Sequence, residues 1–225
     1  MQNHLLILGA MFNLILIFFL SQGQYFIGGF KPPYGINLVL DDYSVIACIV
    51  VNGLFLLITM MSFEKISKYG TVLLVALAGM NGMLLTGDFF NLFVFLEITS
   101  ITAYILASSS KKIQYAFNYL VLGTVGSGFL LFGIVILYAV FGSLNMADIS
   151  MKMEEVKLSQ LILPTFFIFT GLAVETKILP LNGWVRGVYG NTNNLTGALF
   201  ASVYAGTMLF VFGRVFGQII IISGY

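Results

Sequence analysis

The sequence predicts an all-α membrane protein with about seven transmembrane helices, one of them broken near Pro180. Of its 225 residues 59% are apolar and only 8% are charged, whereas about a quarter of the residues of a soluble domain are charged. The mean hydropathy is +1.00. Only a bilayer accommodates so much apolar surface, because the lipid-facing side of a membrane helix can be as apolar as its core. We therefore expect a single transmembrane domain over residues 1–225.

Polar breaks divide the chain into runs that are each long enough to cross the bilayer. A helix needs about 20 apolar residues to cross about 30 Å of hydrocarbon. The first run lacks the positively charged segment that marks a cleaved signal peptide, so we expect it to remain as the first span. The seven predicted spans cover approximately residues 4–20, 41–62, 69–87, 89–109, 115–142, 159–182 and 195–213.

The distribution of basic residues between the two sides predicts the orientation. Seven crossings place successive loops on alternate sides, so five basic residues share the side of the amino terminus and three share the other. Because basic residues favour the cytoplasmic side, we expect a multi-pass protein of the cell membrane with a cytoplasmic amino terminus. The five are Lys65, Lys68, Lys111, Lys112 and Arg186, and the three are Lys31, Lys152 and Lys157.

Charge and motifs exclude several classes of function. The net charge of +1 provides no basic field for nucleic acid. Cys48 is the only cysteine and His4 the only histidine, so the chain cannot form a disulfide or a thiolate metal cluster by itself. No phosphate loop, nucleophile elbow, zinc, haem or dinucleotide motif occurs. We therefore expect no cofactor, no metal site, no nucleic-acid partner and no catalytic centre within this chain.

Three ionisable side chains remain well inside the predicted spans, and they are Glu97, Glu175 and Lys177. A charge near the bilayer centre costs about 2.5 to 3.5 kcal/mol on insertion scales, so such residues usually mark ion or proton paths. We therefore treat all three as candidate ion-translocation residues. For Glu97 the alternative is an interhelical hydrogen bond. For Lys177 the alternative is a side chain that extends to the interface near Trp184 and Arg186.

Pro180 predicts a break in the sixth span, because a proline cannot donate to the carbonyl of Thr176 and its ring pushes that turn apart. Residues two apart on a helix point about 200° from each other. Glu175 and Lys177 therefore cannot pair unless the helix is already unwound. Broken helices line ion sites in many transporters.

Two further features concern packing and the last span. Gly123, Gly126 and Gly128 cluster in the fifth span, where glycines favour close approach of a neighbouring helix. Arg214 follows the last apolar run, so we expect it to end that crossing at the far interface.

Five short stretches are distributed over nearly the whole chain. They are GGFKPPYGI (28–36) leading into Asp41, GDFFNLFVFLE (87–97), YLVLGTVGS (119–127), GSLNMAD (142–148) and PLNGW (180–184). In the order and spacing of these stretches the chain resembles the antiporter-like membrane subunits of Mrp-type sodium/proton antiporters, respiratory complex I, and the archaeal membrane-bound hydrogenase and sulfane-sulfur reductase complexes.

The resemblance implies a plan of about fourteen spans in two inverted repeats, each with a broken helix and buried ionisable groups. This chain corresponds to approximately the second to eighth spans, so it looks like a truncated subunit that contains one repeat. Glu97 matches the family's fifth-helix glutamate, which is thought to pair with a lysine on the broken seventh helix. Glu175 occupies the position of that lysine, and Lys177 is the nearest cation. The eighth span has no relay lysine or histidine in residues 195–213.

From the resemblance we expect a membrane subunit of a multi-subunit respiratory or Mrp-type complex. It would take part in proton or sodium translocation coupled to redox chemistry in other subunits, as part of an ion-translocating oxidoreductase complex. The expected partners are other membrane subunits, among them a full-length or complementary antiporter-like subunit, together with the lipid bilayer and a proton or sodium ion. One alternative is a truncated structural subunit of the membrane arm that does not conduct. Another is a free-standing small transporter, which a single broken helix supports less well.

Overall fold

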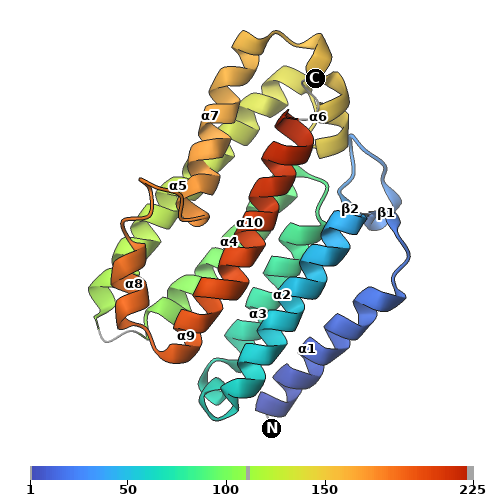
Figure 1. Cartoon of the computed structure of the whole chain (residues 1–225). Helices are drawn as coiled ribbons and strands as arrows, with labels where there is room; N and C mark the ends of the chain where they lie inside the picture. The colour runs from blue at the N-terminus through green and yellow to red at the C-terminus, as the bar shows by residue number, and fades with distance from the viewer. Residues whose placement is uncertain (1, 110–111, 222–225) are drawn as a thin grey trace.

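A bundle of long helices that run up and down forms the body of the chain, for which the computed structural model describes residues 2–109 and 112–221 (Figure 1). Within these residues five helices are long and apolar enough to cross a bilayer, and two shorter apolar helices accompany them. The prediction of about seven membrane helices is therefore confirmed. The bundle consists of α1 (Gln2–Phe19), α2 (Asp42–Met61), α3 (Gly70–Leu85), α4 (Phe89–Ala107), α5 (Ile113–Phe141), α7 (Leu158–Glu175) and a last segment made of α9 (Asn194–Leu199), η4 (Phe200–Tyr204), α10 (Ala205–Phe212) and η5 (Gly213–Ile221).

A small β-hairpin lies in the loop between the first two predicted spans. Strands β1 (Gly23–Phe26) and β2 (Asn37–Leu40) pair antiparallel, with Gly23 opposite Leu40. Single bridges join Leu38 to Thr86 and Asp88 to Asn145, and they hold the hairpin and the start of α6 against the start of α4. We call this the hairpin end of the bundle. The remaining short elements are η1 (Ile27–Gly29), η2 (Phe63–Lys68), α6 (Met146–Lys152), η3 (Met153–Glu155) and α8 (Val185–Asn191).

The sixth predicted span is broken before its proline. Helix α7 ends at Glu175, and the chain turns through residues 176–184 before α8 begins at Val185 (Figure 1). Pro180 lies in this turn, as expected for a residue that lacks a backbone donor. The prediction of a helix broken near Pro180 is confirmed.

The last segment continues beyond its predicted end at Gly213, because η5 extends to Ile221. Arg214 does not end the helix, since its charge is paired inside the bundle. Its guanidinium lies 2.7 Å from the Asp41 carboxylate, and only 7% of the residue is exposed. A paired charge no longer needs to reach water, so the helix can continue past it.

Helices α5 and α7 pack more extensively than any other helix pair within the described residues. A Cβ added at Gly171 would lie 2.6 Å from the Leu130 backbone nitrogen, and one at Gly126 would lie 2.9 Å from the Val174 Cβ. Gly126 therefore has the packing role predicted for it. Gly128 does not, because a Cβ there would meet nothing within 4 Å.

Most of the basic residues used to predict the orientation belong to connections that the structure describes. The connections that carry Lys68 and Lys112 lie at the end opposite the hairpin, and so does α8 with Arg186. Lys111 lies outside the described residues, and the side chain of Lys65 is not described. Which end faces the cytoplasm stays a prediction.

Candidate ion-translocation site

A buried cavity lies where α7 ends, between α4, α5 and the last helical segment. Its volume is about 20 Å³, which is room for about one water molecule. Both Glu175 and Lys177 line it, and its apolar walls include Met83 and Trp184. The other polar side chains that line it are Thr99, Ser100, Tyr119, Tyr204 and Thr207.

Glu175 is the last residue of α7, and it is only 6% exposed. Its Oε1 atom has no hydrogen-bond partner among the described residues, and the indole nitrogen of Trp184 has none either. Buried polar atoms are nearly always paired, and leaving one unpaired costs about 1 to 3 kcal/mol. Both residues line the cavity. The Glu175 oxygen is therefore available to a water molecule, a proton or a cation, and the Trp184 N–H group can donate to a water molecule.

Lys177 follows the end of α7 in a left-handed backbone conformation, with φ of 63°. This conformation costs a residue with a side chain about 1 to 2 kcal/mol. The turn aims the ammonium group into the bundle, where Nζ donates to the Tyr189 hydroxyl at 2.6 Å and to the Phe200 carbonyl at 2.7 Å. Nζ also lies 5.2 Å from the centre of the Tyr189 ring. Lys177 is thus held between α8 and η4.

The break in the helix allows Glu175 and Lys177 to line one cavity, although on a continuous helix they would point apart. Each charge acts electrostatically on the other. In the described parts of the chain, however, the side-chain ion pairs within 4.0 Å are Lys152–Asp148 and Arg214–Asp41. The two opposite charges therefore face the cavity without direct contact.

Glu97 lies on α4, half-buried, and it is not among the residues that line the cavity. Its charge acts on Glu175 and on the Tyr104 hydroxyl. Within residues 2–109 and 112–221 the structure gives its carboxylate no ion pair with Lys177 and no interhelical hydrogen bond. Glu97 thus acts on the cavity as a neighbouring charge.

Aromatic side chains close the cavity on the α5 side. The Tyr119 ring stacks on Trp184 with centroids 4.0 Å apart, and the Tyr104 ring meets Tyr119 edge-on at 4.8 Å. A Cβ at Gly123 would lie 3.0 Å from the Glu175 Oε1 atom and would collide with the Tyr104 hydroxyl. The absence of a side chain at Gly123 therefore lets both polar groups approach α5.

Sequence reasoning did not single out Tyr119, Ser100 or Trp184 as parts of the site. Tyr119 and Trp184 fall within two of the stretches that carry the family resemblance, which was the available signal. For Ser100 no comparable signal existed, because a serine in an apolar helix more commonly hydrogen-bonds its own backbone.

Comparison with known proteins gives consistent matches. Residues 86–223 match the transmembrane family described as NADH:quinone oxidoreductase/Mrp antiporter. The chain is 36% identical over 191 residues to NADH-quinone oxidoreductase subunit N of Desulforudis audaxviator, covering 80% of this chain and 38% of that protein. It is 32% identical over 205 residues to a Na(+)/H(+) antiporter subunit of Bacillus subtilis, covering 87% of this chain and 42% of that protein.

A solved structure of the archaeal membrane-bound sulfane sulfur reductase, a respiratory membrane complex, contains a similar chain. The TM-score is 0.86 at 31% identity, and the match covers 99% of this chain and 47% of that chain. This chain therefore spans less than half the length of each of these three relatives.

Proposed function

Because the chain belongs to the NADH:quinone oxidoreductase/Mrp antiporter transmembrane family, we propose that it is a membrane subunit that helps to move protons or sodium ions. The ions would move within a multi-subunit respiratory or Mrp-type complex, and any redox chemistry would occur in other subunits. The proposed partners are other membrane subunits, among them a full-length or complementary antiporter-like subunit. We also propose one transmembrane domain with a cytoplasmic amino terminus.

The observation that carries this proposal is the shared cavity of Glu175 and Lys177 at the end of α7. The Glu175 carboxylate has an unpaired oxygen, so it can accept a proton or a cation without first losing a protein contact. The ammonium group of Lys177 and the carboxylate of Glu97 are the nearby charges that act on Glu175. A change of charge on Glu97 or Lys177 would therefore alter how tightly Glu175 holds its proton or ion.

The proposal is tested with the intact complex in proteoliposomes, by recording proton and sodium movement when the complex turns over. We expect Glu175→Gln and Lys177→Gln each to reduce ion movement at least tenfold, and Glu97→Gln to reduce it by a smaller factor. Glu155→Gln is the matched control. Glu155 is an exposed acid in η3, and it does not line the cavity. Ion movement at the level of the Glu155→Gln control in all three variants would contradict the proposal.

A second candidate is a structural subunit that fills the membrane arm without conducting. Two observations favour it: Glu97 makes no ion pair with Lys177 within the described residues, and residues 195–213 contain no acid, lysine, arginine or histidine. In that case removing the subunit would disturb assembly of the complex, whereas the three neutral substitutions would leave ion movement intact.

A further inference from the structure

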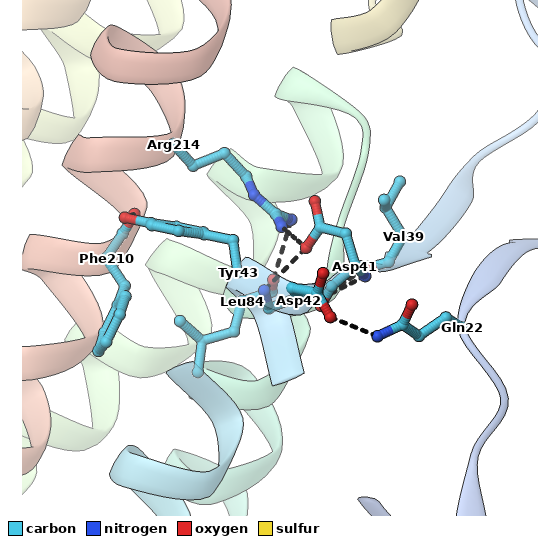
Figure 2. A network of polar contacts seen from close by, with 9 residues as sticks. Gln22, Val39, Asp41, Asp42, Tyr43, Leu84, Phe210 and Arg214 are labelled. Atoms are coloured by element: carbon cyan, nitrogen blue, oxygen red, sulfur yellow. Dashed lines mark hydrogen bonds and ion pairs between the residues drawn. The ribbon is translucent and has the colours of Figure 1, made fainter. Parts of the chain in front are cut away.

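An ion pair joins the start of α2 to the last helical segment at the hairpin end. Figure 2 shows Arg214 reaching from η5 toward Asp41, with Tyr43 beside it. The Arg214 Nη2 atom lies 2.7 Å from Asp41 Oδ1, and Nη1 donates to the Leu84 carbonyl at 3.1 Å. The guanidinium also lies 5.7 Å from the centre of the Tyr43 ring.

The groups around this pair also cap a helix, lie at a helix end or join two helices. The Asp41 carboxylate also accepts from the Ser44 backbone nitrogen at 2.7 Å and so caps α2. Leu84 lies in the last turn of α3, where carbonyl groups lack partners within the helix. The Tyr43 hydroxyl donates to the Phe210 carbonyl at 2.9 Å, which ties α2 to α10. Arg214 and its partners therefore hold α2, α3 and the last segment together.

A series of pockets leads from the hairpin end toward Glu175. The outermost has a volume of about 190 Å³, and its lining includes Asn37, Asp41 and Arg214. A small void of about 10 Å³ follows, between Tyr43, Met83 and Arg214. The cavity of Glu175, about 20 Å³, comes next and shares Met83 with this void. Arg214 thus separates the outer pocket from the void, and Met83 separates the void from the central cavity.

We propose that the Asp41–Arg214 pair closes the path between the hairpin-end pocket and the Glu175 cavity, and that the translocated cation opens it by binding Asp41. The side chain of Asp41 is 43% exposed, whereas that of Arg214 is only 9% exposed. A cation in the outer pocket therefore meets the carboxylate before the guanidinium. While Arg214 is in place, its positive charge and its bulk oppose the passage of a cation and of water. A cation that binds Asp41 competes with Arg214 for the carboxylate, so the attraction that holds Arg214 across the path is weakened.

This inference rests on the proposed function for the identity of the ion, but the closure itself can be measured without ion transport. The reporter is a cysteine at position 83, introduced as Met83→Cys together with Cys48→Ala, because Cys48 is the only native cysteine. The probe is a water-soluble, positively charged methanethiosulfonate reagent, applied to the intact complex in detergent. The measured quantity is the rate at which the introduced cysteine of this chain is modified.

We expect slow modification when the Asp41–Arg214 pair is intact and an increase of at least tenfold with Arg214→Gln. Exchange of the two charges, Asp41→Arg with Arg214→Asp, should restore slow modification. Asp42→Asn is the matched control. Asp42 is exposed and follows Asp41 in the chain, but it accepts a hydrogen bond from Gln22 and makes no ion pair with Arg214, so the rate of modification should stay unchanged. An unchanged rate in Arg214→Gln that still elutes with the assembled complex would overturn the proposal.

If Arg214→Gln fails to assemble, Arg214→Lys keeps the charge on a shorter side chain, and modification must then rise by a smaller factor. A native rate of modification in Arg214→Lys refutes the closure.

The closure and the proposed function can fail separately. If Glu175→Gln, Lys177→Gln and Glu97→Gln all keep the ion movement of the control while Arg214→Gln accelerates modification, the closure stands and the proposed function fails. If the three variants lose ion movement while Arg214→Gln is modified at the native rate, only the closure fails.

Discussion

Two charge clusters in the described part of this bundle differ in how completely their polar atoms are satisfied. At the hairpin end Asp41 and Arg214 form a direct ion pair. Asp41 also caps its own helix α2, and Arg214 also donates to the Leu84 carbonyl of α3. In the central cavity Glu175 and Lys177 make no ion pair with each other, and the Glu175 Oε1 atom has no partner within the described residues. A satisfied pair holds one arrangement of the helix ends, and a cation that binds Asp41 must first displace Arg214. An unsatisfied carboxylate can take up a proton or ion without losing an existing contact.

The largest expected effect on stability comes from breaking the satisfied pair. Asp41→Ala leaves the Arg214 guanidinium buried without a counter-charge and removes the cap of α2. We expect it to lower the free energy of unfolding by about 3 kcal/mol, measured by thermal unfolding in detergent. Asp42→Ala serves as the control, with a change of at most about 0.5 kcal/mol. Equal melting temperatures for the two variants would show that the pair adds little to stability.

The next effect concerns the space around the unsatisfied carboxylate. A side chain at Gly123 would meet the Tyr104 hydroxyl and the Glu175 Oε1 atom, so Gly123→Val should cost about 2 kcal/mol of stability through overpacking. It should also displace the carboxylate and lower ion movement. The matched variant Gly128→Val sits where an added Cβ meets nothing within 4 Å. If both variants lower ion movement equally, the approach of Glu175 to α5 is irrelevant to transport.

A smaller effect of opposite sign is expected at Glu175 itself. Replacing a buried, incompletely bonded carboxylate by a neutral side chain of the same size removes a desolvated charge, so Glu175→Gln should raise the stability by up to about 1 kcal/mol. Thermal unfolding of the same preparation used for transport gives this value. A clear loss of stability would mean that Glu175 is a structural residue, and the contrast with the hairpin end would disappear.

The smallest effect is expected at the partly exposed ion pair of α6. The Lys152 ammonium group lies 2.9 Å from Asp148, and this bond, with one from Ser143, holds the pKa of the Asp148 carboxyl below its ordinary value. The stabilisation is present above the ordinary carboxyl pKa of about 4 and is lost as the pH falls through the lowered pKa. Ion pairs four residues apart on a helix contribute about 0.3 to 0.5 kcal/mol. Asp148→Asn should therefore reduce stability by that amount at pH 7, and the difference from the native chain should shrink as the pH falls below the ordinary carboxyl pKa, in unfolding scans at a series of pH values.

Local sequence patterns were sufficient to predict much of the fold. Apolar runs mark the helices because each span is solvated by lipid along its own length, and Pro180 marks the break because it lacks a backbone donor. The three charges at membrane depth were also visible, since they interrupt apolar runs. Two of them, Glu175 and Lys177, line the central cavity, and Glu97 lies beside it.

The sequence by itself therefore determined the class of protein, the approximate helices, the position of the break and the family. Only the tertiary structure decided which charges meet. Asp41 and Arg214 are 173 residues apart in the chain, and their pairing depends on α2 and η5 reaching the same end of the bundle. Likewise, the left-handed turn at Lys177 aims its ammonium group at Tyr189 and Phe200, which lie on later elements. Hydropathy and proline chemistry act between near neighbours, whereas the pairing of buried charges depends on how distant helices pack.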